Sequence, residues 1–226
     1  MSWYDLISPL YDLGATGSGR PRREAVDQLR LEAGDVVLDI ACGTGLNFPF
    51  IEAAIGSEGL LIGLDFSSGM LAKARRKAER REWTNVRLIQ ADARSISEEL
   101  LRDHAGVNRI DRALCALGFS VVPDWEVVFE RSWALVRPSG RYAVMDWHVK
   151  RRNLFSWFLN SISQGDVSRR IWAPLERNAE DYSYSTFMRG MVFVAAGTMP
   201  AAVSIEREEG QASMQRGREA YTEVAQ

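Results

Sequence analysis

The sequence predicts an α/β domain built around a mainly parallel β-sheet. Two observations lead to this prediction. Short apolar runs typical of buried strands alternate with helical patterns, and the first run, "VVLDIACGTGLNF", leads into a glycine turn. Parallel strands need long crossover connections, which helices between the strands supply. Because such crossovers are right-handed, the helices come to cover the faces of the sheet.

Five apolar runs have the length and composition of strands. They are residues 36–41, 60–66, 86–92, 110–117 and 141–147. Between them, "SSGMLAKARRKAERR" predicts a helix with Ser67 or Ser68 as its N-cap, because its apolar residues recur on one face. A second helix is predicted over "DWEVVFERSWALV", and "RPSG" should end it.

Composition excludes several classes of protein. The 226 residues carry a net charge of −2, which argues against nucleic acid as the main partner, because phosphate binding needs a clustered basic excess. Two cysteines are too few for a disulfide framework or a Cys-based metal site, so we expect no metal. No apolar run is long enough to span a bilayer, and the N-terminal stretch lacks the basic region of a secretory signal. We therefore expect a cytoplasmic protein.

The chain is expected to form one domain over residues 1–203, followed by a polar tail over residues 204–226. Residues 1–30 are predicted to form an N-terminal helical cap. Residues 148–185, where the alternation weakens, are predicted to form a lid or acceptor-binding insertion. The tail has few large apolar residues with which to pack.

The glycine turn after the first strand should face a ligand. In an open parallel sheet, ligands bind at the carboxyl ends of the strands, and glycine lets them approach the backbone. Gly43 and Gly45 match the first two glycines of the dinucleotide fingerprint, but Phe48 replaces the third. Asp39, at the end of the strand, would repel a phosphate. Both features disfavour a nicotinamide enzyme, which remains an alternative, and no Gly-Lys-Ser/Thr follows to make a P-loop.

These residues resemble motif I of the class I S-adenosylmethionine (SAM)-dependent methyltransferases. Asp39, Ala41, Gly43 and Gly45 fill its four positions, and Ala41 departs from the usual glycine. Its Cβ should be tolerated if φ is negative there. The resemblance extends from about residue 4 to residue 147. It implies a Rossmann-like class I methyltransferase fold, with a mainly parallel seven-stranded sheet and helices on both faces. It also implies SAM as cofactor and S-adenosylhomocysteine as product.

The resemblance also assigns roles to residues that follow the later strands. Asp65 would accept hydrogen bonds from the ribose hydroxyls, and Met70 would lie against the adenine. Asp92 would take the adenine amino group, with the Ala93 backbone beside it. Further predicted cofactor-binding residues are Phe66, Leu117 at the end of the fourth strand, and Tyr11, which would close over the methionine end.

Candidate catalytic residues follow the fifth strand, in "MDWH". His148 is the natural proton acceptor near neutral pH, and Asp146 could favour a cation that forms as methyl arrives. Tyr11 is the third candidate, from the N-terminal segment. A solvent-facing loop histidine is the competing interpretation of His148. The cofactor supplies an activated methyl group, so these residues would mainly orient and deprotonate the acceptor.

The strings "WYDLISPLYD", "DFSSGMLAKA" and "FSVVPDW" are similar to a group containing the ubiquinone/menaquinone methyltransferases and the bacterial phospholipid and betaine-lipid N-methyltransferases. This resemblance implies N-methylation of a phospholipid amine headgroup, within lipid metabolism. The alternatives are C- or O-methylation of a quinone precursor or other small molecule, and a SAM-binding module without catalysis.

A segment after the fifth strand suggests peripheral contact with an anionic membrane. The basic residues Lys150, Arg151 and Arg152 precede an apolar stripe that runs from Leu154 to Ile162 if the segment is helical. Basic residues beside large apolar ones suit an interfacial helix. The alternative is a cap helix packed on the domain core. The expected partner is a small-molecule or lipid methyl acceptor, with no nucleic acid.

Overall fold

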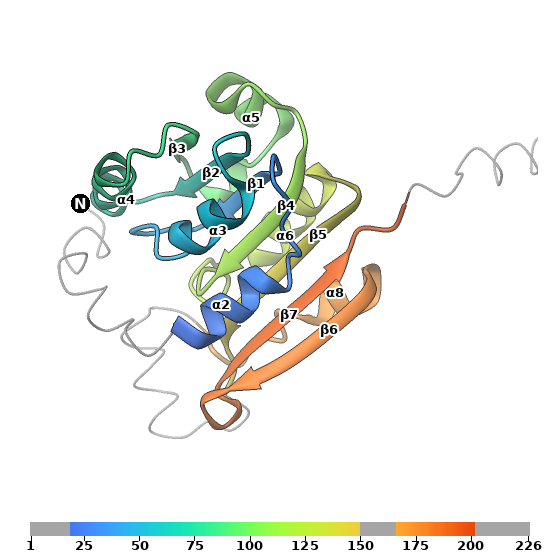
Figure 1. The fold of residues 1–226 in the computed structure, drawn as a ribbon. Coiled ribbons are helices and arrows are strands. Elements are labelled where there is room, and N and C mark those ends of the chain that lie inside the picture. The colour runs from blue at the N-terminus through green and yellow to red at the C-terminus, as the bar shows by residue number, and fades with distance from the viewer. Residues whose placement is uncertain (1–18, 150–165, 202–226) are drawn as a thin grey trace, which may run out of the picture.

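The computed structural model describes residues 19–149 and 166–201, which form a seven-stranded sheet flanked by helices (Figure 1). The spatial order of the strands is β3-β2-β1-β4-β5-β7-β6. Their bounds are β1 Val36–Ile40, β2 Leu60–Asp65, β3 Val86–Gln90, β4 Ile110–Ala116, β5 Val136–Trp147, β6 Glu180–Phe187 and β7 Val192–Thr198. The helices are α2 Gly19–Asp27, α3 Phe48–Ile55, α4 Ser68–Arg80, α5 Glu98–Ala105, α6 Trp125–Leu135 and α8 Ala173–Asn178, with short 3-10 turns η2 Ala93–Ser95 and η3 Met188–Gly190.

Strands β1 to β5 run parallel, and β7 is antiparallel to both of its neighbours, β5 and β6. Strand β1 lies between β2 and β4. The chain therefore builds β2 and β3 on one side of β1, and then crosses over to build β4 and β5 on the other side. This arrangement produces a crevice at the carboxyl ends of β1 and β4, which is where open α/β sheets bind ligands. The sheet is mainly parallel, as the sequence predicts.

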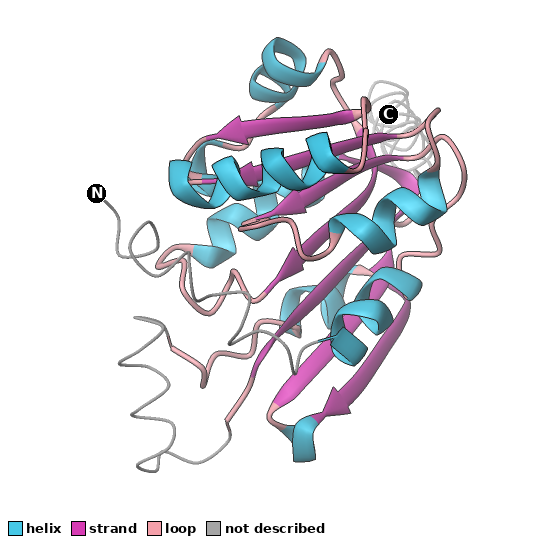
Figure 2. Ribbon diagram, turned by 60° about the vertical axis from the view of Figure 1, so that its left-hand side comes forward, coloured by secondary structure: helices cyan, strands magenta, loops and turns pink. Residues whose placement is uncertain are grey.

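Two apolar cores lie on opposite faces of the sheet, whose strands are magenta in Figure 2. One core contains buried residues of α2, α3 and α4, and the other contains residues of α5, α6 and α8. Both faces of the central strands are therefore covered, which explains why their sequences are continuous apolar runs rather than alternating patterns. Cys42 and Cys115 are free and buried in these cores, as small apolar side chains would be.

All five predicted strands are present, and the helix caps follow the predicted chemistry. The Ser67 hydroxyl accepts a hydrogen bond from the Met70 backbone N–H at 3.1 Å, so Ser67 is the N-cap of α4. Helix α6 ends at Leu135, but "RPSG" does not form a loop, because β5 already begins at Val136. Ser139 takes a positive φ of 64°, and the register with β4 shifts there. The irregular backbone of "RPSG" is thus accommodated within β5 as a β-bulge.

The described part of the predicted insertion consists of α8 and the start of β6. Residues 180–185 pair with β7 at the edge of the sheet, so a lid that extends to residue 185 is too long at this end. Residues 150–165, the N-terminal residues 1–18 of the predicted cap and the whole predicted tail, residues 204–226, lie outside the described residues. Within residues 19–149 and 166–201, no helix has the length and apolar character needed to cross a membrane.

Candidate functional site

A cavity of about 340 Å³ opens at the carboxyl ends of the strands, beside the glycine turn. Its lining comes from the turn after β1, the ends of β2 and β3, the start of α4 and the loop after β4. The lining residues are Ala41, Gly43, Leu64, Asp65, Phe66, Met70, Asp92, Ala93, Arg94, Leu117, Gly118, Val121, Val122 and Pro123. Two carboxylates therefore face a cavity whose other walls are mostly apolar.

The glycine turn is shaped by backbone angles that favour glycine. Gly43 and Gly45 have φ values of +56° and +72°, in the left-handed region. A Cβ on Gly43 would meet nothing within 4 Å, since this residue faces the cavity. A Cβ on Gly45 would lie 2.7 Å from the Phe48 ring. The bulky Phe48 thus fits behind the turn because Gly45, and also Gly63 of β2, leave room for its ring.

Ala41 does not have the negative φ on which its expected tolerance depended. Its φ is +53°, and Leu117 after β4 has a φ of +64°. Both residues line the cavity. Left-handed backbone is strained for residues with a Cβ, at a cost of about 1–2 kcal/mol each. Such strain is typical of ligand-binding positions.

Asp65 connects two of the segments around the cavity. One oxygen of its carboxylate accepts a hydrogen bond from the Gly43 backbone N–H, and the other accepts one from the Ser67 N–H, both at 2.8 Å. The carboxylate at the end of β2 therefore holds the glycine turn and the start of α4 in position. Phe66, next to it, leaves 65% of its surface exposed at the rim of the cavity.

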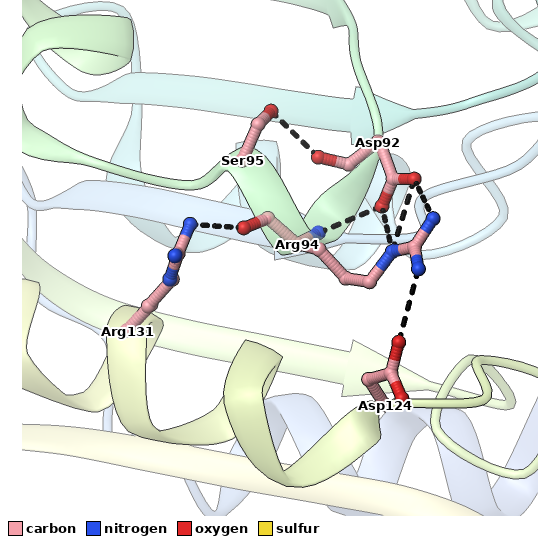
Figure 3. A network of polar contacts seen from close by, with 5 residues as sticks. All are labelled: Asp92, Arg94, Ser95, Asp124 and Arg131. Atoms are coloured by element: carbon pink, nitrogen blue, oxygen red, sulfur yellow. Dashed lines mark hydrogen bonds and ion pairs between the residues drawn. The ribbon is translucent and has the colours of Figure 1, made fainter.

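Asp92, at the end of β3, is bound by a residue for which the sequence analysis predicted no role. Arg94 donates to its carboxylate from Nε at 3.0 and 3.1 Å and from a terminal nitrogen at 2.6 Å, and also contacts Asp124 (Figure 3). These hydrogen bonds lower the pKa of Asp92. An arginine two residues after an aspartate that the sequence predicts to bind a ligand was the available signal for this contact.

Asp39 lies beneath the turn rather than in the cavity wall. It is fully buried, and both of its oxygens accept hydrogen bonds from the Asn47 amide at 3.0 Å. The Asn47 oxygen in turn accepts from Arg22 of α2 at 2.9 Å. Burial raises the pKa of Asp39 to about 7. This buried chain of hydrogen bonds joins β1, the start of α3 and α2. Asp39 therefore holds together the segments behind the glycine turn.

The predicted catalytic residues of β5 lie outside the cavity lining. Asp146 is buried, accepts hydrogen bonds from the backbone N–H groups of Ser120 at 2.9 Å and of Trp147 at 2.8 Å, and has a pKa raised to about 6 by burial. It therefore fixes the loop that follows β4. His148 is nearly buried, and its ring packs edge-on against Trp172 with the ring centroids 4.5 Å apart. It is not the solvent-facing loop residue of the competing interpretation.

The structure thus brings together eight of the predicted cofactor-binding residues around one cavity. They are Ala41, Gly43, Asp65, Phe66, Met70, Asp92, Ala93 and Leu117. Asp39 and Gly45 support the turn from behind, and Tyr11 lies outside the described residues. The apolar wall formed by Val121, Val122 and Pro123 was missed, because residues of a loop become a cavity wall only once β4 and α6 are placed.

The geometry fits an adenosyl cofactor. Carboxylates at the ends of adjacent strands suit hydroxyl and amino donors, the apolar walls suit a planar base, and an open Gly43 admits a close approach to the backbone. Residues 37–140 match the family model described as a methyltransferase domain. This part of the chain is therefore similar to methyltransferase domains, and the class I members of that family use SAM as their cofactor.

Curated proteins similar to this chain include demethylmenaquinone methyltransferases. The chain is 29% identical over 125 residues to a demethylmenaquinone methyltransferase of Oceanobacillus iheyensis, which covers 55% of this chain and 50% of the relative. It is 30% identical over 159 residues to one of Listeria welshimeri, with 68% and 64% covered. The chain thus matches between half and just under two thirds of these relatives' lengths. A crystal structure of a SAM-dependent methyltransferase from Aquifex aeolicus shares the fold, with a TM-score of 0.57, 16% identity, and 79% and 89% of the two chains covered.

Proposed function

We propose that this protein transfers a methyl group from SAM to a small, largely apolar acceptor. The observation that carries the proposal is the pair of carboxylates, Asp65 and Asp92, that face one apolar-walled cavity beside the glycine turn. When bound, the cofactor supplies a methyl group activated by its sulfonium charge.

The chain's own residues would hold the cofactor at both ends of its nucleoside. Asp65 would accept hydrogen bonds from the ribose hydroxyls, and Asp92 from the adenine amino group. Met70 and Phe66 would contact the base on the apolar side. Gly43 would lie against the methionine part, since its missing side chain leaves the backbone open to the cavity. The left-handed backbone at Ala41 and at Leu117 would shape the floor of the cavity between these two residues.

The bound cofactor would supply an electrophilic methyl group, and the chain's residues would hold the acceptor's nucleophilic atom toward it. The acceptor's proton must leave before or during methyl transfer. His148 is proposed to take this proton. Asp146 is proposed to favour the cation that forms as the methyl group arrives. Asp146 would act through the loop it holds at Ser120, since its oxygens accept from backbone N–H groups. Tyr11 is proposed to close over the cofactor from the N-terminal segment.

We infer that a quinone precursor is the first candidate acceptor and that the reaction is C-methylation. This assignment rests on the names of the curated relatives, which are demethylmenaquinone methyltransferases. N-methylation of a phospholipid amine headgroup is the second candidate. It is favoured by the sequence "VKRRNLFSWFLN", in which a basic cluster precedes large apolar residues, as in segments that contact anionic lipid.

The experiment is transfer of labelled methyl from SAM to three acceptors in parallel. These are a demethylated isoprenoid quinone, phosphatidylethanolamine in anionic vesicles, and a panel of soluble amines. We expect labelled quinone as the main product. Label only in the phospholipid would replace the first candidate by the second. Binding of SAM with no transfer to any acceptor would favour a non-catalytic module.

A further inference from the structure

Arg94 joins two walls of the cavity across its rim (Figure 3). On one side it holds the Asp92 carboxylate at the end of β3 through three contacts of 2.6 to 3.1 Å. On the other side its second terminal nitrogen donates to Asp124, just before α6, at 2.9 Å. Asp124 makes no side-chain cap to its own helix, so this carboxylate serves the bridge.

Arg94 uses most of the acceptor capacity of Asp92, because three of its N–H groups bond to the carboxylate and the single Nε–H is shared by both oxygens. A carboxylate has about four lone-pair positions. One oxygen accepts from the Arg94 backbone N–H at 2.9 Å and from Nε at 3.0 Å, and the other accepts from Nε at 3.1 Å and a terminal nitrogen at 2.6 Å. An amino group that hydrogen-bonds to Asp92 therefore competes with the Arg94 side chain for the lone pairs of this carboxylate.

Only the side chain needs to move for this exchange. The main chain around Arg94 is fixed, because Arg131 donates to the Arg94 carbonyl and the Ser95 hydroxyl donates to the Asp92 carbonyl at 2.7 Å. The Arg94 side chain itself is 51% exposed, and an arginine side chain can rotate into solvent without leaving a buried charge. The ion pair between Arg94 and Asp92 thus has short distances, but it can break without any movement of the main chain.

We propose that Arg94 is a latch that competes with the adenine amino group for Asp92, and so weakens and slows cofactor binding in an ionic-strength-dependent way. This inference rests on the proposed function, which places adenine at Asp92. The neighbouring charges are favourable for a latch, because the guanidinium has a carboxylate on each side.

The test is calorimetric titration of S-adenosylhomocysteine, which lacks the sulfonium charge, into wild type, R94M and D124N at low and high salt. We expect R94M to bind about two- to fivefold tighter than wild type at low salt, the range set by an exposed ion pair. D124N should shift the affinity in the same direction by less. Added salt should strengthen binding to wild type, since it screens the bridge, and leave R94M unchanged.

R109M is the matched control. Arg109 makes a similarly exposed pair with Glu98 at 2.8 Å, just before the amino-terminal end of β4 and so at the opposite end of the strands from the cavity. Its loss should therefore leave the affinity unaltered at both salt concentrations. Equal or weaker binding by R94M, or wild-type affinity that falls with salt, would overturn the latch while leaving the cofactor assignment intact. Wild-type protein that binds no S-adenosylhomocysteine would instead overturn the proposed function. If R94M fails to fold, D124N and the wild-type salt dependence decide.

Discussion

The Asp65 carboxylate at the end of β2 accepts a hydrogen bond from the Gly43 backbone N–H at 2.8 Å, across 22 residues of sequence. The same side chain that is proposed to bind the ribose therefore also holds the turn that approaches the rest of the cofactor. Ligand contact and loop geometry are coupled in one residue, so a substitution at this position acts on both.

We expect D65A to lower the affinity for SAM by about 1.5–3 kcal/mol, the usual contribution of a hydrogen bond to a charged group. Calorimetric titration measures this effect, and circular dichroism checks the fold. D111A is the matched control, because the Asp111 carboxylate also accepts a hydrogen bond from a backbone N–H, that of Val36 at 2.8 Å, but at the amino-terminal end of β4, away from the cavity. Unchanged SAM affinity in folded D65A protein would refute the ribose assignment.

Alanine at the two turn glycines should produce different defects. G43A should cost about 1–2 kcal/mol of stability for its left-handed φ, and its methyl group should obstruct the cofactor. G45A should lower the free energy of unfolding by about 1–3 kcal/mol more than G43A does, because its Cβ would meet the Phe48 ring at 2.7 Å. Urea unfolding and SAM titration separate the two effects.

G106A supplies the control for the turn glycines. Gly106 has a φ of +73° and open space around it, as Gly43 does, but it caps α5 away from the cavity. It should lose stability as G43A does and keep full cofactor affinity. A G43A variant that binds SAM as well as G106A does would show that Gly43 is not at the cofactor.

Stability should depend on pH through Asp39. Burial raises its folded-state pKa to about 7, above the ordinary value, so between about pH 4 and pH 7 the folded state holds a proton that the unfolded state has lost. The free energy of unfolding should therefore fall as pH rises through this window and level off above it, by on the order of 2–4 kcal/mol. Urea unfolding of wild type and D39N at each pH isolates the contribution, because D39N cannot ionise and lacks this slope. Parallel curves for the two proteins would contradict the raised pKa.

His148 is expected to affect turnover more than cofactor affinity. H148A should lower kcat strongly with little change in SAM binding, because its ring lies outside the cofactor cavity. H148F distinguishes a proton acceptor from a packing residue, since phenylalanine preserves the edge-on contact with Trp172 but not the basic nitrogen. Recovery of turnover in H148F would assign His148 to packing alone.

Local pattern was sufficient for much of the fold and for part of the site. The strand runs, the Ser67 cap and the carboxylates at the ends of β2 and β3 follow from residues that are adjacent in sequence, because strand periodicity and capping are short-range effects. The strands β6 and β7 were not predicted individually. The exposed, polar β6 is stabilised by pairing with β7 at the sheet edge rather than by its own pattern.

The sequence by itself determined the class of the domain, the glycine turn and the position of Asp65 and Asp92. Only the tertiary structure decided that Ala41 turns left-handed, that Phe48 fits against Gly45 and Gly63, and that Arg94 joins Asp92 to Asp124. The physical reason is the range of the interactions. Caps and turns act over a few residues, whereas a backbone angle at a crevice, the space behind a ring and an ion pair across a cavity depend on segments that meet only when the sheet has assembled.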